Sequence, residues 1–302
     1  VGASYSLTNI FICVAFGGGI GASVIVSRYF GAGQYRAMKL AVYTAFLAFL
    51  GVSVLLGGLG LAASEEIMLL LNTPADVLDM AVEYLNIYFL GLPFLFMYNV
   101  LSSMFNALGK SRIPLYFLIF SSLFNIVLDV ISVTWLNMGV AGVAWATLIA
   151  QGISAVLSFI VFMRLMGRLS KEPSGIFDRS ELISMTKIAL PSILQQSTVS
   201  IGMMLVQSVV NSFGSQALAG FSAGMRIESI CVVPMSGVGS AISSYTAQNI
   251  GARSEERVEK GFRAAIQMVI VFAVILCVAL QLFHEPLIGL FLGDEGTAAA
   301  LS

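Results

Sequence analysis

The sequence predicts an all-α polytopic membrane protein, built from two six-helix bundles that repeat in the same orientation, with eight helices in this chain. Three observations predict this fold class. First, 58% of the 302 residues are hydrophobic and only 10% are charged, against about 25% charged residues in a soluble domain. Second, the apolar residues form eight long runs. Third, landmarks of the first part of the chain return 220 residues later.

Each apolar run is long enough to cross a bilayer as one helix, which takes about 20 residues. The runs are unbroken and show no alternation of apolar and polar residues, so helices are favoured over the strands of a barrel. The predicted spans are residues 3–27, 40–63, 82–106, 114–135, 139–163, 188–212, 221–246 and 262–283.

Lysine and arginine are restricted to alternate connections between these spans. Fourteen of the 15 basic residues lie in or beside the loops of one side, and only Arg226 lies inside a span. Loops on the other side carry the acidic residues Glu65, Glu66, Asp76, Asp79, Glu285, Asp294 and Glu295. Because basic loops stay in the cytoplasm, we expect a multi-pass protein of the inner or plasma membrane with cytoplasmic basic loops.

The second half of the chain repeats the first. With a shift of 220 residues, Gly17 coincides with Gly237 and Glu65 coincides with Glu285, each at the same place relative to a span. Six spans separate the two copies, so both copies run through the bilayer in the same direction. Parallel repeats of this kind are typical of transporters.

The shift also predicts how the chain is divided. The sequence has no counterpart of the first helix or of the tenth to twelfth helices, so we expect the second to ninth helices of twelve. The expected divisions are a first lobe over residues 1–167, a cytoplasmic linker over residues 168–186 and the start of a second lobe over residues 187–302.

The main candidate for a binding site is a set of three polar residues in two neighbouring spans. Asn125 and Asp129 are four residues apart, so they share one face of a helix. Thr147 follows a short turn and is placed to oppose them. A carboxylate beside an amide and a hydroxyl offers oxygen ligands to a proton or to a hard cation such as Na+. Alternatively, Asp129 lies near the outer helix end and reaches water, while Asn125 and Thr147 join helices.

Polar and adaptable residues of the later spans are candidates for the lining of a substrate cavity: Arg226, Glu228, Gln195, Gln196 and Met203. Arg226 and Glu228 are two residues apart and do not face each other on a helix, so each needs another partner or water. Structural pairing of the charged residues, and hydrogen bonds between helices for the glutamines, are the competing interpretations.

Catalysis and nucleotide binding find little support. The glycine-rich residues 17–21 lie in a span and follow no strand, so they indicate close helix packing and not a dinucleotide loop. The single histidine, His284, has no cysteine near it in the sequence, and no zinc-ligand spacing is present. We expect no enzyme activity, no cofactor and no nucleic-acid partner.

Several motifs give the chain a resemblance to a known family: SRYFGAG at residues 27–33, its echo AQNIGA at 247–252, NALGKSR at 106–112 and GVAGVAWAT at 139–147. In this order and spacing they resemble the multidrug and toxic compound extrusion (MATE) family, nearer its DinF-like branch. The resemblance covers the whole chain. It implies a V-shaped, twelve-helix exporter that expels amphipathic, often cationic drugs in exchange for inward Na+ or H+.

The resemblance also implies roles for individual residues. In the DinF-like branch, a cation site uses an asparagine and an aspartate four residues apart and a threonine on the next helix, which match Asn125, Asp129 and Thr147. A further aspartate of that site, on the first helix, would precede Val1. The NorM-like branch carries a carboxylate on the helix that corresponds to span 188–212, and none stands there.

Together these features predict a monomeric, cation-coupled antiporter in the lipid bilayer, driven by H+ or Na+, that exports drug-like small molecules by alternating access. The nearest rival hypothesis is a flippase for lipid-linked sugars from the same superfamily. Its anionic substrate calls for several cationic cavity residues, and only Arg226 is present. The sequence also leaves open a membrane-embedded enzyme and a passive channel or scaffold.

Overall fold

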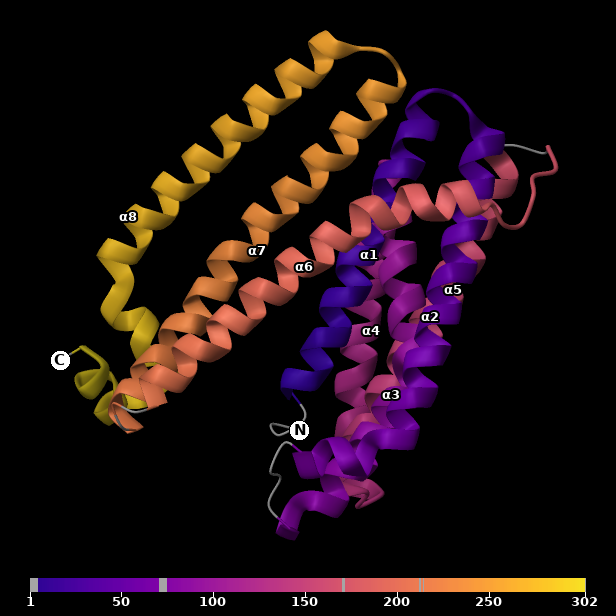
Figure 1. Cartoon of the computed structure of the whole chain (residues 1–302). Helices are drawn as coiled ribbons and strands as arrows, with labels where there is room; N and C mark the ends of the chain where they lie inside the picture. Colours follow the sequence, from indigo (N-terminus) through magenta and orange to yellow (C-terminus); the bar gives the residue numbers. More distant parts are fainter. Residues whose placement is uncertain (1–4, 71–74, 170–171, 212, 214, 302) are drawn as a thin grey trace. The chain divides into compact units, whose positions relative to one another are not determined.

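A computed structural model describes residues 5–70, 75–169, 172–211, 213 and 215–301. This part of the chain is helical and contains no strand (Figure 1). Its α-helices are α1 (Tyr5–Gly31), α2 (Tyr35–Leu70), α3 (Ala75–Ala107), α4 (Arg112–Val130), α5 (Gly139–Leu169), α6 (Arg179–Asn211), α7 (Ser215–Gly251) and α8 (Glu255–Leu301). All 8 are long and apolar enough to cross a membrane, which confirms the predicted spans for the described residues.

The helices extend beyond the spans that hydropathy predicts. α6 begins at Arg179, well before the predicted span 188–212. α8 continues to Leu301, through residues His284–Gly296, so the expectation of an outer loop there is wrong. A helix satisfies its own backbone hydrogen bonds in lipid and in water alike. Hydropathy therefore marks where a helix crosses the bilayer and not where the helix ends.

The predicted span 114–135 is not a single α-helix. α4 ends at Val130, and a π-helical turn, η1, covers Ile131–Trp135. Thr134 Oγ1 of this turn donates a hydrogen bond to the carbonyl of Val130, the last residue of α4, at 2.6 Å. Short π-helical segments are often found at functional sites, and this one follows directly after Asp129.

The turns α1–α2 and α7–α8 repeat each other. Gln34 and Ser254, which are 220 residues apart, each donate a backbone hydrogen bond to the carbonyl five residues earlier, at 3.0 and 2.8 Å. Gly33 and Arg253 are also 220 residues apart, and both have positive φ angles, 69° and 56°. The repeat that the sequence indicates is therefore present in the backbone of the described residues.

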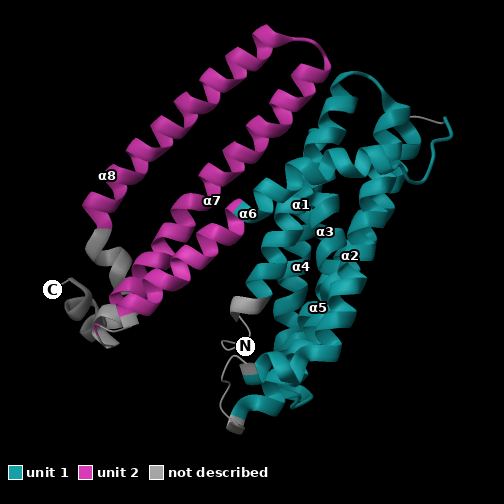
Figure 2. Ribbon diagram, in the orientation of Figure 1, with its two compact units in different colours: residues 1–194 teal, residues 195–302 magenta. Residues whose placement is uncertain are grey.

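The helices pack as two compact units, residues 1–194 and residues 195–302 (Figure 2). In unit 1, α3 packs against α1, α2 and α5, and α4 packs against α5. The core of unit 1 is filled by large apolar side chains, including Phe89, Phe96, Phe105, Phe162 and Met104. In unit 2, α7 packs against α8. The boundary between the units falls inside α6, whereas the expected lobes and linker (1–167, 168–186 and 187–302) stay a prediction.

The glycines of α1 allow its neighbours to approach closely, as the sequence predicts. A Cβ atom on Gly18 would lie 2.6 Å from the Phe49 ring on α2, and a Cβ atom on Gly19 would lie 2.6 Å from Ser103 Oγ on α3. Real Cβ atoms do not approach other atoms so closely, so larger residues would push these helices apart. The glycines at positions 17 and 21 of the same stretch face α6.

Candidate functional site

The structure brings Asn125 and Thr147 into contact. Asn125 lies on α4 and Thr147 on α5, and the Asn125 Nδ2 donates a hydrogen bond to Thr147 Oγ1 at 3.4 Å. Thr147 Oγ1 in turn donates to the Val143 carbonyl at 3.0 Å. The hydroxyl proton is thus directed at the backbone, and the lone pairs of Oγ1 receive Asn125. This chain of bonds orients the Asn125 amide and leaves its carbonyl oxygen available as a ligand.

Asp129 lies one helical turn beyond Asn125 on the same face of α4. Its side chain is half-buried, and its Oδ1 atom is buried with no hydrogen-bond partner among the described residues. A buried, unpaired polar atom destabilises a structure by about 1–3 kcal/mol, and more if the group is charged. A proton or a cation at Oδ1 would relieve this cost. The ion-binding role of Asn125, Asp129 and Thr147 stays a prediction.

A small cavity adjoins Thr147 on the side that faces α3. Its volume is about 20 Å³, which is room for about one water molecule. The polar residues that line it are Tyr84, Tyr88, Thr147 and Gln151. Tyr88 also donates a hydrogen bond to the Thr8 carbonyl at 3.2 Å, which ties α3 to α1. The cavity therefore places polar groups from α3 beside the predicted site.

Three of these lining residues are not among the candidates that the sequence predicts: Tyr84, Tyr88 and Gln151. A signal for them exists, because Tyr84 and Tyr88 are four residues apart and Gln151 follows Thr147 by four. Such spacing puts each pair on one helix face. The sequence does not show that these two faces meet. They meet because α3 packs against α5 in the structure.

A larger cavity, of about 440 Å³, lies between the end of α2, the start of α3 and α5. It is lined by Glu65, Asp79, Glu83 and Asn86, together with Trp145 and apolar side chains. Glu65 and Asp79 are among the acids expected on the outer side of the membrane. Three carboxylates around one cavity make its potential negative, which attracts cations to this end of unit 1.

The five candidates for a substrate cavity all lie in unit 2. Gln195, Gln196 and Met203 are on α6, and Arg226 and Glu228 are on α7. Gln196 and Met203 are half-buried, whereas the side chains of Gln195, Arg226 and Glu228 are exposed. Their participation in a cavity stays a prediction.

Comparison with known families decides the relationship. The sequence model of the family described as MatE matches residues 1–131 and 191–302. The chain belongs to the MatE family. The first MatE match lies within unit 1, and the second begins shortly before unit 2. The predicted family is therefore confirmed, whereas its DinF-like branch stays a prediction.

Curated MatE relatives include proteins named for multidrug resistance. The chain is 32% identical over 276 residues to the probable multidrug resistance protein YpnP of Bacillus subtilis (strain 168), covering 91% of this chain and 62% of the relative. It is 26% identical over 310 residues to the probable multidrug resistance protein YoeA of the same strain, covering 98% of this chain and 66% of the relative. The chain thus spans slightly less than two thirds of the length of these relatives.

Solved MatE-type structures share the fold. A MOP superfamily transporter from Pyrococcus furiosus superposes with a TM-score of 0.89 at 24% identity, over 99% of this chain and 67% of that chain. A MATE structure in a bent conformation gives a TM-score of 0.88 at 25% identity, over 99% of this chain and 68% of that chain. These neighbours consist of two repeated helical bundles, which confirms the predicted fold class. The chain is a multi-pass membrane protein from a family of transporters, not of enzymes.

Proposed function

We propose that the full-length protein is a cation-coupled antiporter that exports amphipathic, often cationic small molecules by alternating access. The observation that carries this proposal is the hydrogen bond from Asn125 to Thr147 at 3.4 Å, one helical turn from Asp129, whose Oδ1 is buried and unpaired. An ion-coupled antiporter needs a group that exchanges an ion for a substrate. An ion bound in this cluster would relieve the cost of the unpaired Asp129 Oδ1.

The coupling ion is H+ or Na+, and both fit the chemistry of the cluster. A proton on Asp129 removes the charge and turns the carboxyl group into a donor. A sodium ion finds the oxygen ligands that hard cations prefer in the Asp129 carboxylate, the Asn125 amide and the Thr147 hydroxyl. The acidic cavity lined by Glu65, Asp79 and Glu83 concentrates either cation at the proposed outer end.

The ion drives the cycle through its unequal affinity for two states. Only a ligand that binds one conformation more tightly than the other shifts the balance between them. Ion binding from outside at Asp129 changes how α4 packs on α5 and α3 and favours the state that releases substrate outward. The ion then leaves to the cytoplasm, and the empty protein returns. The basic loops are cytoplasmic in this proposal.

The substrate class follows from the relatives. The relatives YpnP and YoeA are named as multidrug resistance proteins, and the acidic cavity in unit 1 suits cationic molecules. A relative from Shewanella oneidensis, 24% identical over 306 residues, is named as a FAD transporter. Anionic cargo is therefore the second outcome that an experiment has to include.

The proposal is tested with the full-length protein in proteoliposomes loaded with a cationic dye or with FAD. Inward Na+ and H+ gradients are imposed separately, and export is followed by fluorescence. We expect gradient-driven export of the dye, and we expect Asp129→Asn to export no faster than without a gradient. Thr186→Val is the control, because Thr186 is exposed and its hydroxyl bonds only to the Leu182 carbonyl of the same helix. Export by Asp129→Asn at the wild-type rate would refute the coupling role of Asp129. Export of FAD but not of the dye would mean that the substrates are anionic and not cationic.

A further inference from the structure

The segment that leads into α6 is attached to the first two helices by side-chain hydrogen bonds. Tyr29 Oη on α1 donates to Glu181 Oε1 at 2.5 Å. The backbone N–H of Asp178 donates to Thr44 Oγ1 on α2 at 3.0 Å. Lys39 on α2 also donates to the carbonyl of Glu172, the residue just after the linker leaves α5, at 3.3 Å. We call these three contacts the α6 clamp.

The start of α6 shows that the clamp replaces local bonds. Asp178 caps α6, because its Oδ1 accepts hydrogen bonds from the backbone of Ser180 at 2.7 Å and of Glu181 at 3.1 Å. In a capping box, the glutamate at the third helical position reaches back to the N–H of the capping residue. Here that N–H is bonded to Thr44, and Glu181 is bonded to Tyr29. Two local groups are thus used to attach α6 to its neighbours.

Close packing continues the attachment along α6. A Cβ atom on Gly21 would lie 2.5 Å from the Met185 carbonyl and 2.8 Å from Ala189 Cβ, and a Cβ atom on Gly17 would lie 2.8 Å from the Ile193 backbone. Met185 is buried and belongs to the core of unit 1. Two glycines, one helical turn apart, therefore seat the first half of α6 on α1.

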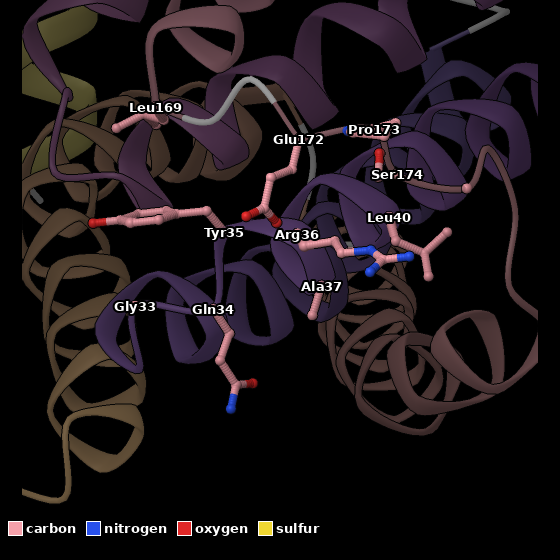
Figure 3. A pocket seen from close by; sticks show the side chains of 11 residues that line it. Gly33, Gln34, Tyr35, Arg36, Ala37, Leu40, Leu169, Glu172, Pro173 and Ser174 are labelled. Carbon is pink, nitrogen blue, oxygen red and sulfur yellow. The ribbon is translucent and has the colours of Figure 1, made fainter.

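The linker itself is held by these polar contacts more than by burial. A cavity of about 1050 Å³ separates the α1–α2 turn from residues Glu172–Gly175. Figure 3 shows Arg36 and Tyr35 from one wall and Glu172 from the other, with their side chains at this cavity. Because the space is open, apolar packing contributes little here, and the hydrogen bonds of the clamp fix the position of the linker.

The clamp side chains of α1 and α2 are not repeated at the corresponding positions of the second copy. The residues 220 positions after Tyr29, Lys39 and Thr44 are Asn249, Glu259 and Ala264. The second copy therefore lacks the phenol, the ammonium group and the hydroxyl that make the three contacts.

We propose that residues 179–193 of α6 remain part of unit 1 throughout transport, and that any movement of unit 2 is taken up beyond Ile193. The unit boundary lies there, between Leu194 and Gln195. This inference rests on the proposed alternating access, and it makes the first half of α6 a fixed wall of the first bundle.

Cross-linking tests the clamp directly. In the full-length protein without its free cysteines, Tyr29→Cys and Glu181→Cys are joined by a bifunctional methanethiosulfonate, which spans the space of the two side chains through disulfide bonds that a reducing agent cleaves. We expect the cross-linked protein to export at the rate of the same variant before treatment. Loss of export that a reducing agent restores would overturn the proposal, because the contact would then have to open in every cycle.

Distances between spin labels test the same inference without transport. One pair joins Arg112→Cys on α4 to Lys187→Cys, and the other joins Arg112→Cys to Val206→Cys beyond the boundary. With and without Na+, at neutral and acid pH, and with dye, we expect the first distance to stay constant and the second to change. The proposal fails if both distances change together or if the second never changes.

Removal of the clamp completes the test. In Tyr29→Phe/Thr44→Val, the distribution of distances between labels at positions 112 and 187 should become broader. Ser184→Ala loses only a bond to Ser180 within α6, so it should leave the width of this distribution unchanged. An unchanged width in the clamp variant would mean that these contacts do not hold α6. If the wild type shows no gradient-driven export, the proposed function alone is rejected. The label distances would still test whether the clamp holds the first half of α6 on unit 1.

Discussion

Asn125 on α4 and Thr147 on α5 are joined by a side-chain hydrogen bond of 3.4 Å. The Thr147 hydroxyl is itself oriented by its bond to the Val143 carbonyl at 3.0 Å. The backbone of α5 thereby orients an amide on α4, next to the unpaired carboxylate oxygen of Asp129. This arrangement leads to predictions for the proposed ion site, and the glycine contacts lead to predictions for the fold. All of them concern the full-length protein.

Thr147→Val removes the acceptor for Asn125 Nδ2 while keeping the shape of the side chain. A hydrogen bond of this kind contributes about 1 kcal/mol, so we expect about a fivefold rise in the cation concentration needed for half-maximal export. Thr147→Ser keeps the hydroxyl and should stay close to the wild type. Export rates measured at increasing concentrations of the driving cation check this prediction. The same half-maximal concentration for the valine and serine variants would contradict it.

Gln151→Leu removes a polar group from the 20 Å³ cavity beside Thr147. A water or ion there loses one partner, so we expect half-maximal export to need a higher cation concentration, with little change in the maximal rate. The control is Ile153→Leu, because Ile153 is exposed on the same helix. A titration of export against cation compares the two variants. If Gln151→Leu behaves as the control does, the cavity has no part in ion binding.

Gly21→Ala and Gly58→Ala make the same chemical change in opposite surroundings. The new Cβ atom at position 21 meets the Met185 carbonyl at 2.5 Å, whereas nothing lies within 4 Å at position 58. We expect Gly21→Ala to destabilise the protein by about 1–3 kcal/mol through overpacking. Gly58→Ala should be neutral or stabilise it by up to about 1 kcal/mol. The midpoint of thermal denaturation in detergent measures both, and similar midpoints would contradict the close contact of α1 with α6.

Gly33 and Arg253 occupy matching turns with φ angles of 69° and 56°. Gly33→Ala puts a Cβ atom into the left-handed region and should destabilise the protein by about 1–2 kcal/mol. Arg253→Gly relieves the same strain in the second copy, so we expect a neutral or stabilising effect of up to about 1 kcal/mol. The midpoints of thermal denaturation check this, because the midpoint should fall for Gly33→Ala and should not fall for Arg253→Gly. A destabilised Arg253→Gly protein would mean that the arginine side chain is needed in that turn.

Much of the architecture could be predicted from the sequence, because a bilayer imposes local requirements. Each span must satisfy its own backbone hydrogen bonds, so a long apolar run has to be a helix. The spans, their number in the described residues and the repeat at 220 residues follow from such local patterns. The shared face of Asn125 and Asp129 is equally local, since it depends only on their spacing.

The contacts between helices were decided by tertiary structure alone. The meeting of Thr147 with Asn125, the lining of the small cavity by Tyr84 and Gln151, and the attachment of α6 to unit 1 join residues that no local pattern connects. Lipid tails are as apolar as the helix surfaces, so hydrophobicity does not select which faces pair. Shape and a few hydrogen bonds make that choice, and both depend on where distant helices come to lie. The sequence by itself thus determined which segments cross the membrane and that they repeat, whereas packing determined which residues share a site.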